Sequence, residues 1–168
     1  MLHFVKNKQI HFVNHSNKIK NYIKFNFLEN INDEFIDLIL DDTNNKIVFH
    51  NIDNSINNYN NTSFLVYHKV YSKKTIKYYI LLLGTNKKIR NCGYGKLLLD
   101  DFIDHIKNKA TKKFSIFINS INDSKEFYIK YGFKKLDTIK KNTLFFNYEP
   151  YSFNNNYHIF YNNYEINI

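Results

Sequence analysis

The stretch Arg90–Leu99 reads RNCGYGKLLL, and it decides how we expect the chain to fold. The 168 residues include four glycines and one arginine, and Gly93, Gly95 and that arginine fall within six positions. An apolar run precedes the stretch and a leucine-rich run follows it, which indicates a tight turn between a buried strand and a helix. Because the first N–H groups of a helix are unpaired and lie at the positive end of its dipole, such a turn favours a phosphate or pyrophosphate.

The residues before the turn predict a β-hairpin. Ser63–Tyr71 and Thr75–Leu83 are both rich in strand-forming residues, and the polar letters SKK separate them. The second run ends in five consecutive apolar residues, Tyr79–Leu83, so we expect that strand to be buried on both faces near the middle of a sheet.

The residues after the turn predict alternating helices and strands. Leu98, Phe102 and Ile106 recur at helical spacing from Gly95 to about Lys109. Further along we expect a strand, a short helix that stops at Gly132, and two more strands. These four elements are Lys113–Ile118, Asp123–Tyr131, Phe133–Ile139 and Thr143–Glu149. The centre of the chain is therefore α/β, with a right-handed crossover.

The first sixty residues carry weaker signals. Apolar and polar residues alternate over Ile19–Leu28, and the letters NDEFIDLILDD that follow place Phe35, Leu38 and Ile39 on one helical face. Asp33 and Glu34 fall in the first turn of that helix, where the dipole favours acidic residues, and Asp37, Asp41 and Asp42 follow them. We expect a short strand at Ile47–His50 and an exposed, asparagine-rich loop at Asp53–Thr62.

Length and composition describe one folded domain. The apolar fraction is 43% and the aromatic fraction 18%, and no run approaches the roughly 18 apolar residues of a membrane helix. The N-terminus lacks a secretory pattern and Cys92 is the one cysteine, so we expect a cytoplasmic protein with no membrane partner. The net charge is +9, but the lysines are scattered along the sequence. We attribute them to the codon usage of an AT-rich genome, which disfavours a nucleic-acid partner.

Three kinds of diphosphate-binding turn can be compared with this sequence. A Walker loop would need Gly where Arg90 stands and Ser or Thr where Leu97 stands, and a dinucleotide fingerprint would need a third Gly in place of Leu98. Arg-x-x-Gly-x-Gly at the end of a buried strand remains. There the sequence resembles the GNAT superfamily of acyl-CoA-dependent N-acyltransferases, and the letters SKEFYIKYGF at Ser124–Phe133 resemble that family's late helix.

The resemblance implies a single-domain GNAT-like α/β (α+β) fold: a mixed, mostly antiparallel sheet of six or seven strands with helices on both faces. It implies an N-acetyltransferase that uses acetyl-CoA, without a metal, and acts by direct attack of an amine in a ternary complex. Tyr128 would be the general acid for the leaving thiolate, and a backbone N–H near Leu83 would polarise the thioester. The residues expected to bind the coenzyme are Leu83, Gly84, Thr85, Arg90, Asn91, Cys92, Gly93, Tyr94, Gly95 and Lys96.

Each of these assignments has a structural alternative. The two glycines could shape a turn only, and Tyr128 could pack in the core. In a chain whose usual cation is lysine, Arg90 indicates a need for a planar, forked donor. No Asp or Glu lies on Thr75–Leu83 to act as a base, so His68, Tyr78 and Tyr79 are the candidates. The late helix also departs from the family pattern at Ile121 and Ser124.

The missing base keeps two other functions open: a CoA-binding module without catalysis, and a basic nucleic-acid-binding protein. The acceptor stays open among amino sugars, polyamines, small amines and protein amino groups. We expect residues 1–150 to form the acetyltransferase domain. Residues 151–168 would be an aromatic, Asn-rich extension that serves as an added strand, a lid or the contact of a homodimer.

Overall fold

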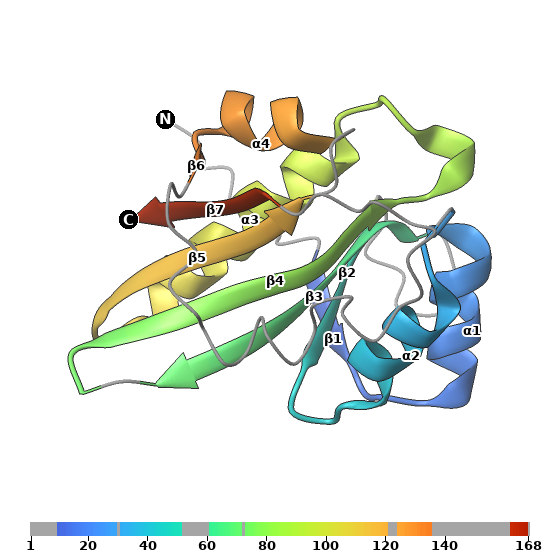
Figure 1. The fold of residues 1–168 in the computed structure, drawn as a ribbon, viewed down its shortest axis with the longest axis horizontal. Helices are drawn as coiled ribbons and strands as arrows, with labels where there is room; N and C mark the ends of the chain where they lie inside the picture. The colour runs from blue at the N-terminus through green and yellow to red at the C-terminus, as the bar shows by residue number, and fades with distance from the viewer. Residues whose placement is uncertain are drawn as a thin grey trace, which may run out of the picture.

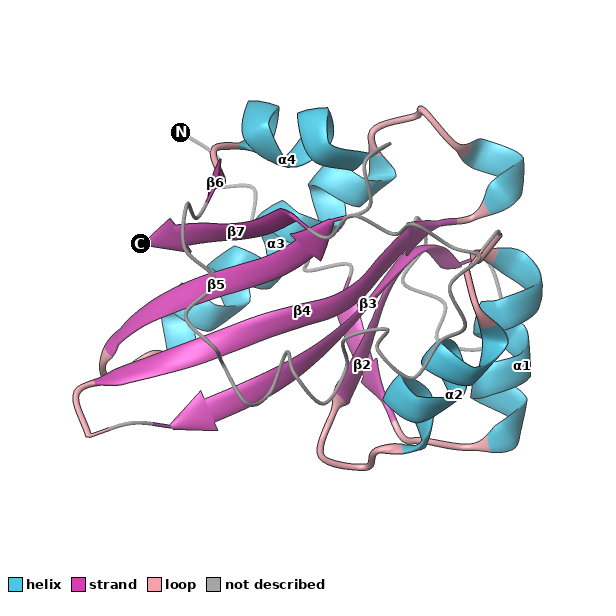
Figure 2. Ribbon diagram, in the orientation of Figure 1, coloured by secondary structure: helices cyan, strands magenta, loops and turns pink. Residues whose placement is uncertain are grey.

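The computed structural model describes residues 10–29, 31–51, 61–71, 73–120, 124–135 and 162–167. Figures 1 and 2 show one twisted sheet with helices packed against it. The strands are β1 (Ile10–Val13), β2 (Lys46–Asn51), β3 (Asn61–Tyr71), β4 (Thr75–Thr85), β5 (Lys113–Ser120), β6 (Lys134–Lys135) and β7 (Asn162–Asn167). The helices are α1 (Asn17–Asn26), α2 (Asp33–Asp41), the short 3₁₀ helix η1 (Lys87–Ile89), α3 (Tyr94–Lys109) and α4 (Lys125–Tyr131).

The sheet has seven strands in the order β1-β2-β3-β4-β5-β7-β6. Among these described strands β4 and β5 pair in parallel, and every other neighbouring pair is antiparallel. The helix α3 connects the two parallel strands, as a parallel pair requires. The predicted mixed, mostly antiparallel sheet is therefore confirmed.

Two apolar clusters fill the space between the sheet and its helices. The first joins α3 and the Tyr128–Phe133 region of α4 to one face, and the second joins α1 and α2 to the other. Consecutive residues of β4 alternate between the two clusters. Tyr78 and Ile80 belong to the first cluster, and Tyr79 and Leu81 belong to the second. The central apolar run is thus buried on both faces, as the sequence predicts.

Two expectations for the N-terminal third need correction. The alternating run at Ile19–Leu28 lies mostly in α1, because Ser16 caps a helix there and accepts a hydrogen bond from the N–H of Ile19. In α2 the side chain of Leu38 is 46% exposed, because the buried face is formed by residues on its other side. These buried residues are Phe35, Ile36, Ile39 and Leu40.

The C-terminal part of the fold differs in its details from the expectation. The predicted strand Phe133–Ile139 is described only over β6, and the predicted strand Thr143–Glu149 lies outside the described residues. The extension instead supplies β7, which pairs with both β5 and β6.

The predicted loop at Asp53–Thr62 also lies mostly outside the described residues, and its predicted end is wrong because Thr62 is buried in β3. No described helix is long and apolar enough to cross a membrane.

Candidate functional site

The centre of the sheet opens between β4 and β5. Their parallel pairing ends at Ile80 and Ile118, yet β4 continues to Thr85. The register against β3 shifts between Val66, which pairs with Leu82, and Tyr67, which pairs with Ile80, so Leu81 forms a β-bulge. The bulge and the end of pairing leave one edge of Leu81–Thr85 without a strand partner among the described strands. Its main-chain groups can therefore bind an extended ligand.

The turn that follows β4 combines two left-handed residues with a helix start. Asn91 has φ 64° and Gly93 has φ 81°, and Gly93 is the N-cap residue of α3. No side chain caps this helix, and a Cβ built on Gly93 would meet nothing within 4 Å. No side chain therefore caps the first N–H groups of α3, which leaves them available to an anion at the helix N-terminus.

Strand β3 fixes both ends of this turn. At its start the N–H of Asn86 donates to the carbonyl of Thr62 at 2.8 Å. At its end the buried hydroxyl of Ser63 donates to the carbonyl of Tyr94 at 3.1 Å. Because two consecutive residues of one strand hold both ends, β3 fixes the position of the turn.

Two other glycines allow close packing around the turn. A Cβ on Gly84 would come within 2.5 Å of the ring of Phe64, a contact that real Cβ atoms do not make. A Cβ on Gly95 would lie 3.3 Å from the hydroxyl of Thr85 and 3.8 Å from the ring of Phe127. Gly84 thus lets α1 and β3 approach the strand, and Gly95 lets α3 begin close to its end.

The guanidinium of Arg90 faces the end of α1. One terminal nitrogen donates to the carboxylate of Glu29 at 2.7 Å, and the other donates to the carbonyl of Phe27 at 3.2 Å. The ammonium of Lys87 lies 3.8 Å from the same carboxylate. The forked donor inferred from the sequence is therefore used here to join the turn to the segment between α1 and α2.

The other side chains predicted for the turn differ in their exposure and contacts. Lys96 pairs with Asp100 at 2.7 Å, one helical turn along α3. Cys92 is exposed, and its thiol lies 3.6 Å from the carbonyl of Arg90. The ring of Tyr94 is half-buried, 6.4 Å from the ring of His50.

Tyr128 lies on α4 in the apolar cluster beneath α3, and its side chain is 5% exposed. Its ring makes edge contacts with Phe127 at 5.0 Å and Phe133 at 5.7 Å between centroids. Burial raises the pKa of the Tyr128 phenol well above its ordinary value, so the hydroxyl stays protonated at neutral pH. Gly132 ends the helix with φ 116°, the left-handed stop that the sequence predicts.

The three candidates for the base are dispersed. His68 is half-buried, and its Nδ1 lies 2.8 Å from the side-chain oxygen of Asn45. Tyr78 faces the cluster under α3, whereas Tyr79 faces the opposite side and stacks on Phe117 at 5.0 Å. The structure therefore does not bring the three together.

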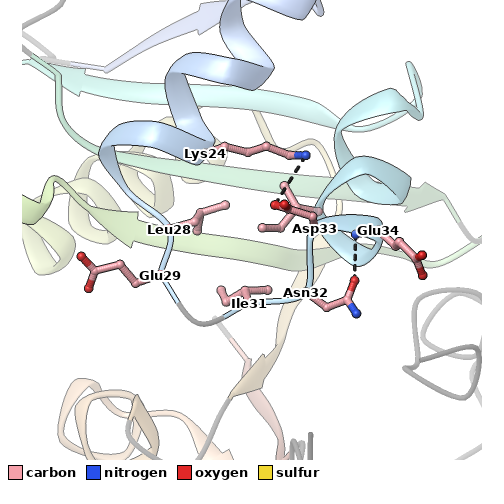
Figure 3. A pocket seen from close by; sticks show the side chains of 8 residues that line it. Lys24, Leu28, Glu29, Ile31, Asn32, Asp33 and Glu34 are labelled. Atoms are coloured by element: carbon pink, nitrogen blue, oxygen red, sulfur yellow. Dashed lines mark hydrogen bonds and ion pairs between the residues drawn. The ribbon is translucent and has the colours of Figure 1, made fainter. Parts of the chain in front are cut away.

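A cavity of about 510 Å³ lies where α1 leads into α2. Figure 3 shows Glu29 and Glu34 extending to opposite sides of it, while an ion pair joins Lys24 and Asp33 in its lining. Lys24 lies 3.6 Å from Asp33 and 2.6 Å from Asp37, and Lys20 lies 2.9 Å from Asp41. Two lysines of α1 thus pair with three of the five acidic residues of the α2 segment that the sequence singles out.

Comparison with known proteins places this geometry in a family. A family model described as an acetyltransferase (GNAT) domain matches residues 26–149. This chain belongs to the GNAT acetyltransferase family. The predicted family, fold class and enzyme class, an N-acetyltransferase, are thereby confirmed.

Solved GNAT structures share the fold. A GNAT acetyltransferase from Elizabethkingia anophelis with acetyl-CoA bound has 20% identity and a TM-score of 0.58, over 95% of this chain and 99% of that one. Naa50 of Arabidopsis thaliana, in complex with the bisubstrate analogue CoA-Ac-MVNAL, has 16% identity and a TM-score of 0.54 over the same shares. The IAA acetyltransferase from Bacillus cereus has 13% identity and a TM-score of 0.58, over 95% and 98%. No curated protein sequence matches the chain.

Two residues of this candidate site are absent from the sequence-based prediction. Ser63 can be assigned to the site only from its register opposite Thr85. Glu29 can be assigned to it only from its contact with Arg90. The position of Ser63 at the start of a predicted strand is the one signal that could have pointed to the turn. Nothing in the sequence near Glu29 indicates its partner.

Proposed function

We propose that this GNAT protein transfers the acetyl group of acetyl-CoA directly to a primary amine in a ternary complex. The observation that carries the proposal is the uncapped start of α3 behind the left-handed Gly93, next to the unpaired edge of β4. A coenzyme with a diphosphate and an extended, amide-bearing arm needs those two features side by side.

The residues fit acetyl-CoA in three respects. The N–H groups of Asn91–Lys96 would bind the diphosphate, because they lie at a helix N-terminus with no competing side-chain cap. The free edge at Leu83–Thr85 would pair with the amides of the pantetheine arm. A main-chain N–H near Leu83, on the same edge, would polarise the thioester carbonyl. Arg90 would act by holding the turn in place.

Tyr128 would assist the departure of the thiolate. The amine nitrogen bonds to the acetyl carbon, the carbon–sulfur bond breaks, and the sulfur takes up a proton. A buried phenol that stays protonated can donate its hydrogen to that sulfur at any pH near neutral. The attacking amine must lose a proton as well, to one of the base candidates or to water.

The cavity between α1 and α2 supports an acceptor site on the face opposite α3. Its lining residues Leu28 and Glu29 follow Phe27, whose Cβ would lie 3.5 Å from a Cβ on Gly84 of β4. The segment that lines the cavity therefore follows directly on a residue that packs against β4. We also propose that residues 1–150 form the catalytic domain and that residues 151–168 are an extension that completes the sheet through β7.

Calorimetry with acetyl-CoA, followed by an acetyl-transfer assay on a panel of amines, tests this function. The products should be detected by mass spectrometry, because the exposed thiol of Cys92 would react with thiol reagents. We expect saturable binding of acetyl-CoA and acetylation of at least one amine. Binding without transfer would indicate a CoA-binding module that lacks catalysis, and the absence of binding would contradict the proposal.

A further inference from the structure

Lysines that are scattered in the sequence gather at one end of the molecule. This end consists of the β3–β4 hairpin, the last turn of α3 and the start of β5, and we call it the hairpin end (Figure 1). Its lysines are Lys69, Lys73, Lys74, Lys77, Lys107, Lys109, Lys112 and Lys113. The lysines are therefore scattered along the sequence, but the fold brings these eight to the same end of the sheet.

Main-chain pairing brings the two basic segments together. Thr75 at the start of β4 pairs with Lys113 at the start of β5. The ammonium of Lys112 lies 3.5 Å from the carbonyl of Lys73. Helix α3 ends at Lys109, three residues before Lys112. The hairpin and the turn after α3 thus lie side by side, and both carry lysines.

The charge of the hairpin end is not neutralised within the described residues. Residues 69–77 and 105–118 contain no Asp or Glu. The Lys and Arg side chains that do pair with carboxylates lie on α1, in the turn after β4, at the start of α3 and on α4. They are Lys20, Lys24, Lys87, Arg90, Lys96 and Lys130. The excess of positive charge is therefore a local property of the hairpin end.

The hairpin end also carries an exposed aromatic ring, which lies beside one of these lysines. Tyr71, the last residue of β3, is 68% exposed, and the ammonium of Lys69 lies 4.6 Å from the centre of its ring. Lysines without a carboxylate partner among the described residues, next to an exposed aromatic ring, suit a chain of phosphates with accessible bases. The lysines attract the phosphates and the ring stacks on a base. A membrane surface would need several exposed apolar side chains, and Tyr71 is the one large exposed side chain of this kind on the described hairpin.

We propose that the hairpin end binds single-stranded nucleic acid. The surface is separate from the proposed acetyl-CoA site, because the hairpin turn and the glycine turn lie at opposite ends of β4. The strand has 11 residues and so spans about 33 Å at 3.3 Å per residue. Binding of a nucleic acid therefore leaves the coenzyme site open.

Fluorescence anisotropy with labelled oligo(U) and oligo(dT) over a range of salt concentrations tests the proposal. The key variant is Lys73→Gln with Lys112→Gln, and the matched control is Lys18→Gln with Lys130→Gln, which removes the same charge elsewhere. All four lysines are exposed. We expect the key variant to bind about tenfold more weakly and to lower the salt slope by about 1.4, since each lost phosphate contact changes it by about 0.7. Tyr71→Ala should weaken binding at an unchanged salt slope.

Four results would overturn the proposal. The first is an equal loss of affinity in the key and control variants, which would show that the net charge of the protein alone causes the effect. The second is tighter binding of a duplex than of either single strand. The third is equal binding of poly-glutamate, which would indicate an acidic protein as partner. The fourth is displacement of the oligonucleotide by saturating acetyl-CoA, which would place it in the coenzyme site.

Discussion

The guanidinium of Arg90 donates a 2.7 Å hydrogen bond to the carboxylate of Glu29, 61 positions earlier in the sequence. Its second terminal nitrogen donates to the carbonyl of Phe27 at 3.2 Å. One side chain thus joins the glycine turn, proposed to bind the diphosphate, to the end of α1, beside the proposed acceptor cavity. This contact suggests that Arg90 supports coenzyme binding by fixing the turn rather than by charge alone.

Arg90→Ala should weaken acetyl-CoA binding about fivefold, because a partly exposed ion pair contributes about 1 kcal/mol or less. Arg90→Lys should not restore the affinity, since an ammonium cannot reach the carboxylate and the carbonyl with a planar fork. Calorimetry of the wild-type protein and the two variants measures the dissociation constant for acetyl-CoA. An unchanged dissociation constant for Arg90→Ala would show that the contact is irrelevant to the coenzyme.

Gly93→Ala should weaken acetyl-CoA binding by up to about tenfold, because a left-handed φ costs an L-residue about 1–2 kcal/mol. Gly93→Asn should lose less of the affinity for acetyl-CoA, because asparagine tolerates that conformation. A clash with the protein cannot explain a loss in Gly93→Ala, since no protein atom lies within 4 Å of the Cβ position. If titrations gave alanine and asparagine equal affinities, the conformation of the turn would not be the cause.

Ser63→Ala should weaken acetyl-CoA binding about fivefold, because it removes the hydroxyl that holds the carbonyl of Tyr94, a contribution of about 1 kcal/mol. Ser16→Ala is the matched control. It removes the cap of α1, at a cost of about 1 kcal/mol in the free energy of unfolding, and should leave the affinity unchanged. Equal affinities of the two variants would remove the proposed role of β3 in positioning the turn.

Tyr128→Phe should lower kcat about a hundredfold and change the acetyl-CoA dissociation constant by less than about twofold, because a proton donor to the leaving group acts in the transition state. Steady-state kinetics and calorimetry separate the two quantities. Because burial raises the pKa of this phenol, kcat should show no decline from its ionisation at neutral or mildly alkaline pH. An unchanged kcat would assign Tyr128 to core packing.

Stability should fall in mild acid because of His50. This residue of β2 is buried, and Asp101 of α3 lies next to it. Its Nδ1 lies 2.7 Å from the hydroxyl of Thr62 and its Nε2 lies 3.7 Å from the carboxylate of Asp101. Burial lowers the pKa of His50 below its ordinary 6.5, Asp101 partly offsets the effect, and nearby His11 adds to it. The unfolded chain therefore binds the proton at higher pH than the folded one, so the stability contributed above about pH 6.5 is lost as the pH falls.

The fall in Tm between about pH 7.5 and about pH 5.5 measures this effect. His50→Gln should show a smaller fall than the wild-type protein over that interval, even if its Tm at the higher pH is lower. An equal fall in both proteins would assign the acid sensitivity to other groups.

The parts of the fold that local patterns determine could be predicted from the sequence. The β3–β4 hairpin, the glycine turn, α3 and the stop at Gly132 each depend on neighbouring residues, and the structure contains them all. The helical nature of α1 was also encoded locally. Ile19, Tyr22 and Ile23 face the core while Phe25 is 80% exposed, which is a helical rather than an alternating arrangement.

Long-range contacts could not be predicted in this way. The pairing of β7 with β5 joins residues more than forty positions apart, and the contact of Arg90 with Glu29 depends on where α1 ends. The gathering of lysines at the hairpin end depends on the parallel pairing of β4 with β5, since Lys73 and Lys112 are remote in sequence. The bulge at Leu81 arises from a shift of register between two strands whose apolar patterns are continuous.

A crystal structure of the protein with CoA bound tests the central claim most directly. We predict that the diphosphate lies within hydrogen-bond distance of the main-chain N–H groups of Asn91–Lys96. The pantetheine arm should run along the unpaired edge of β4 beyond Ile80 and bring its sulfur to the hydroxyl of Tyr128. A coenzyme bound elsewhere, or a sulfur remote from that hydroxyl, would contradict the account.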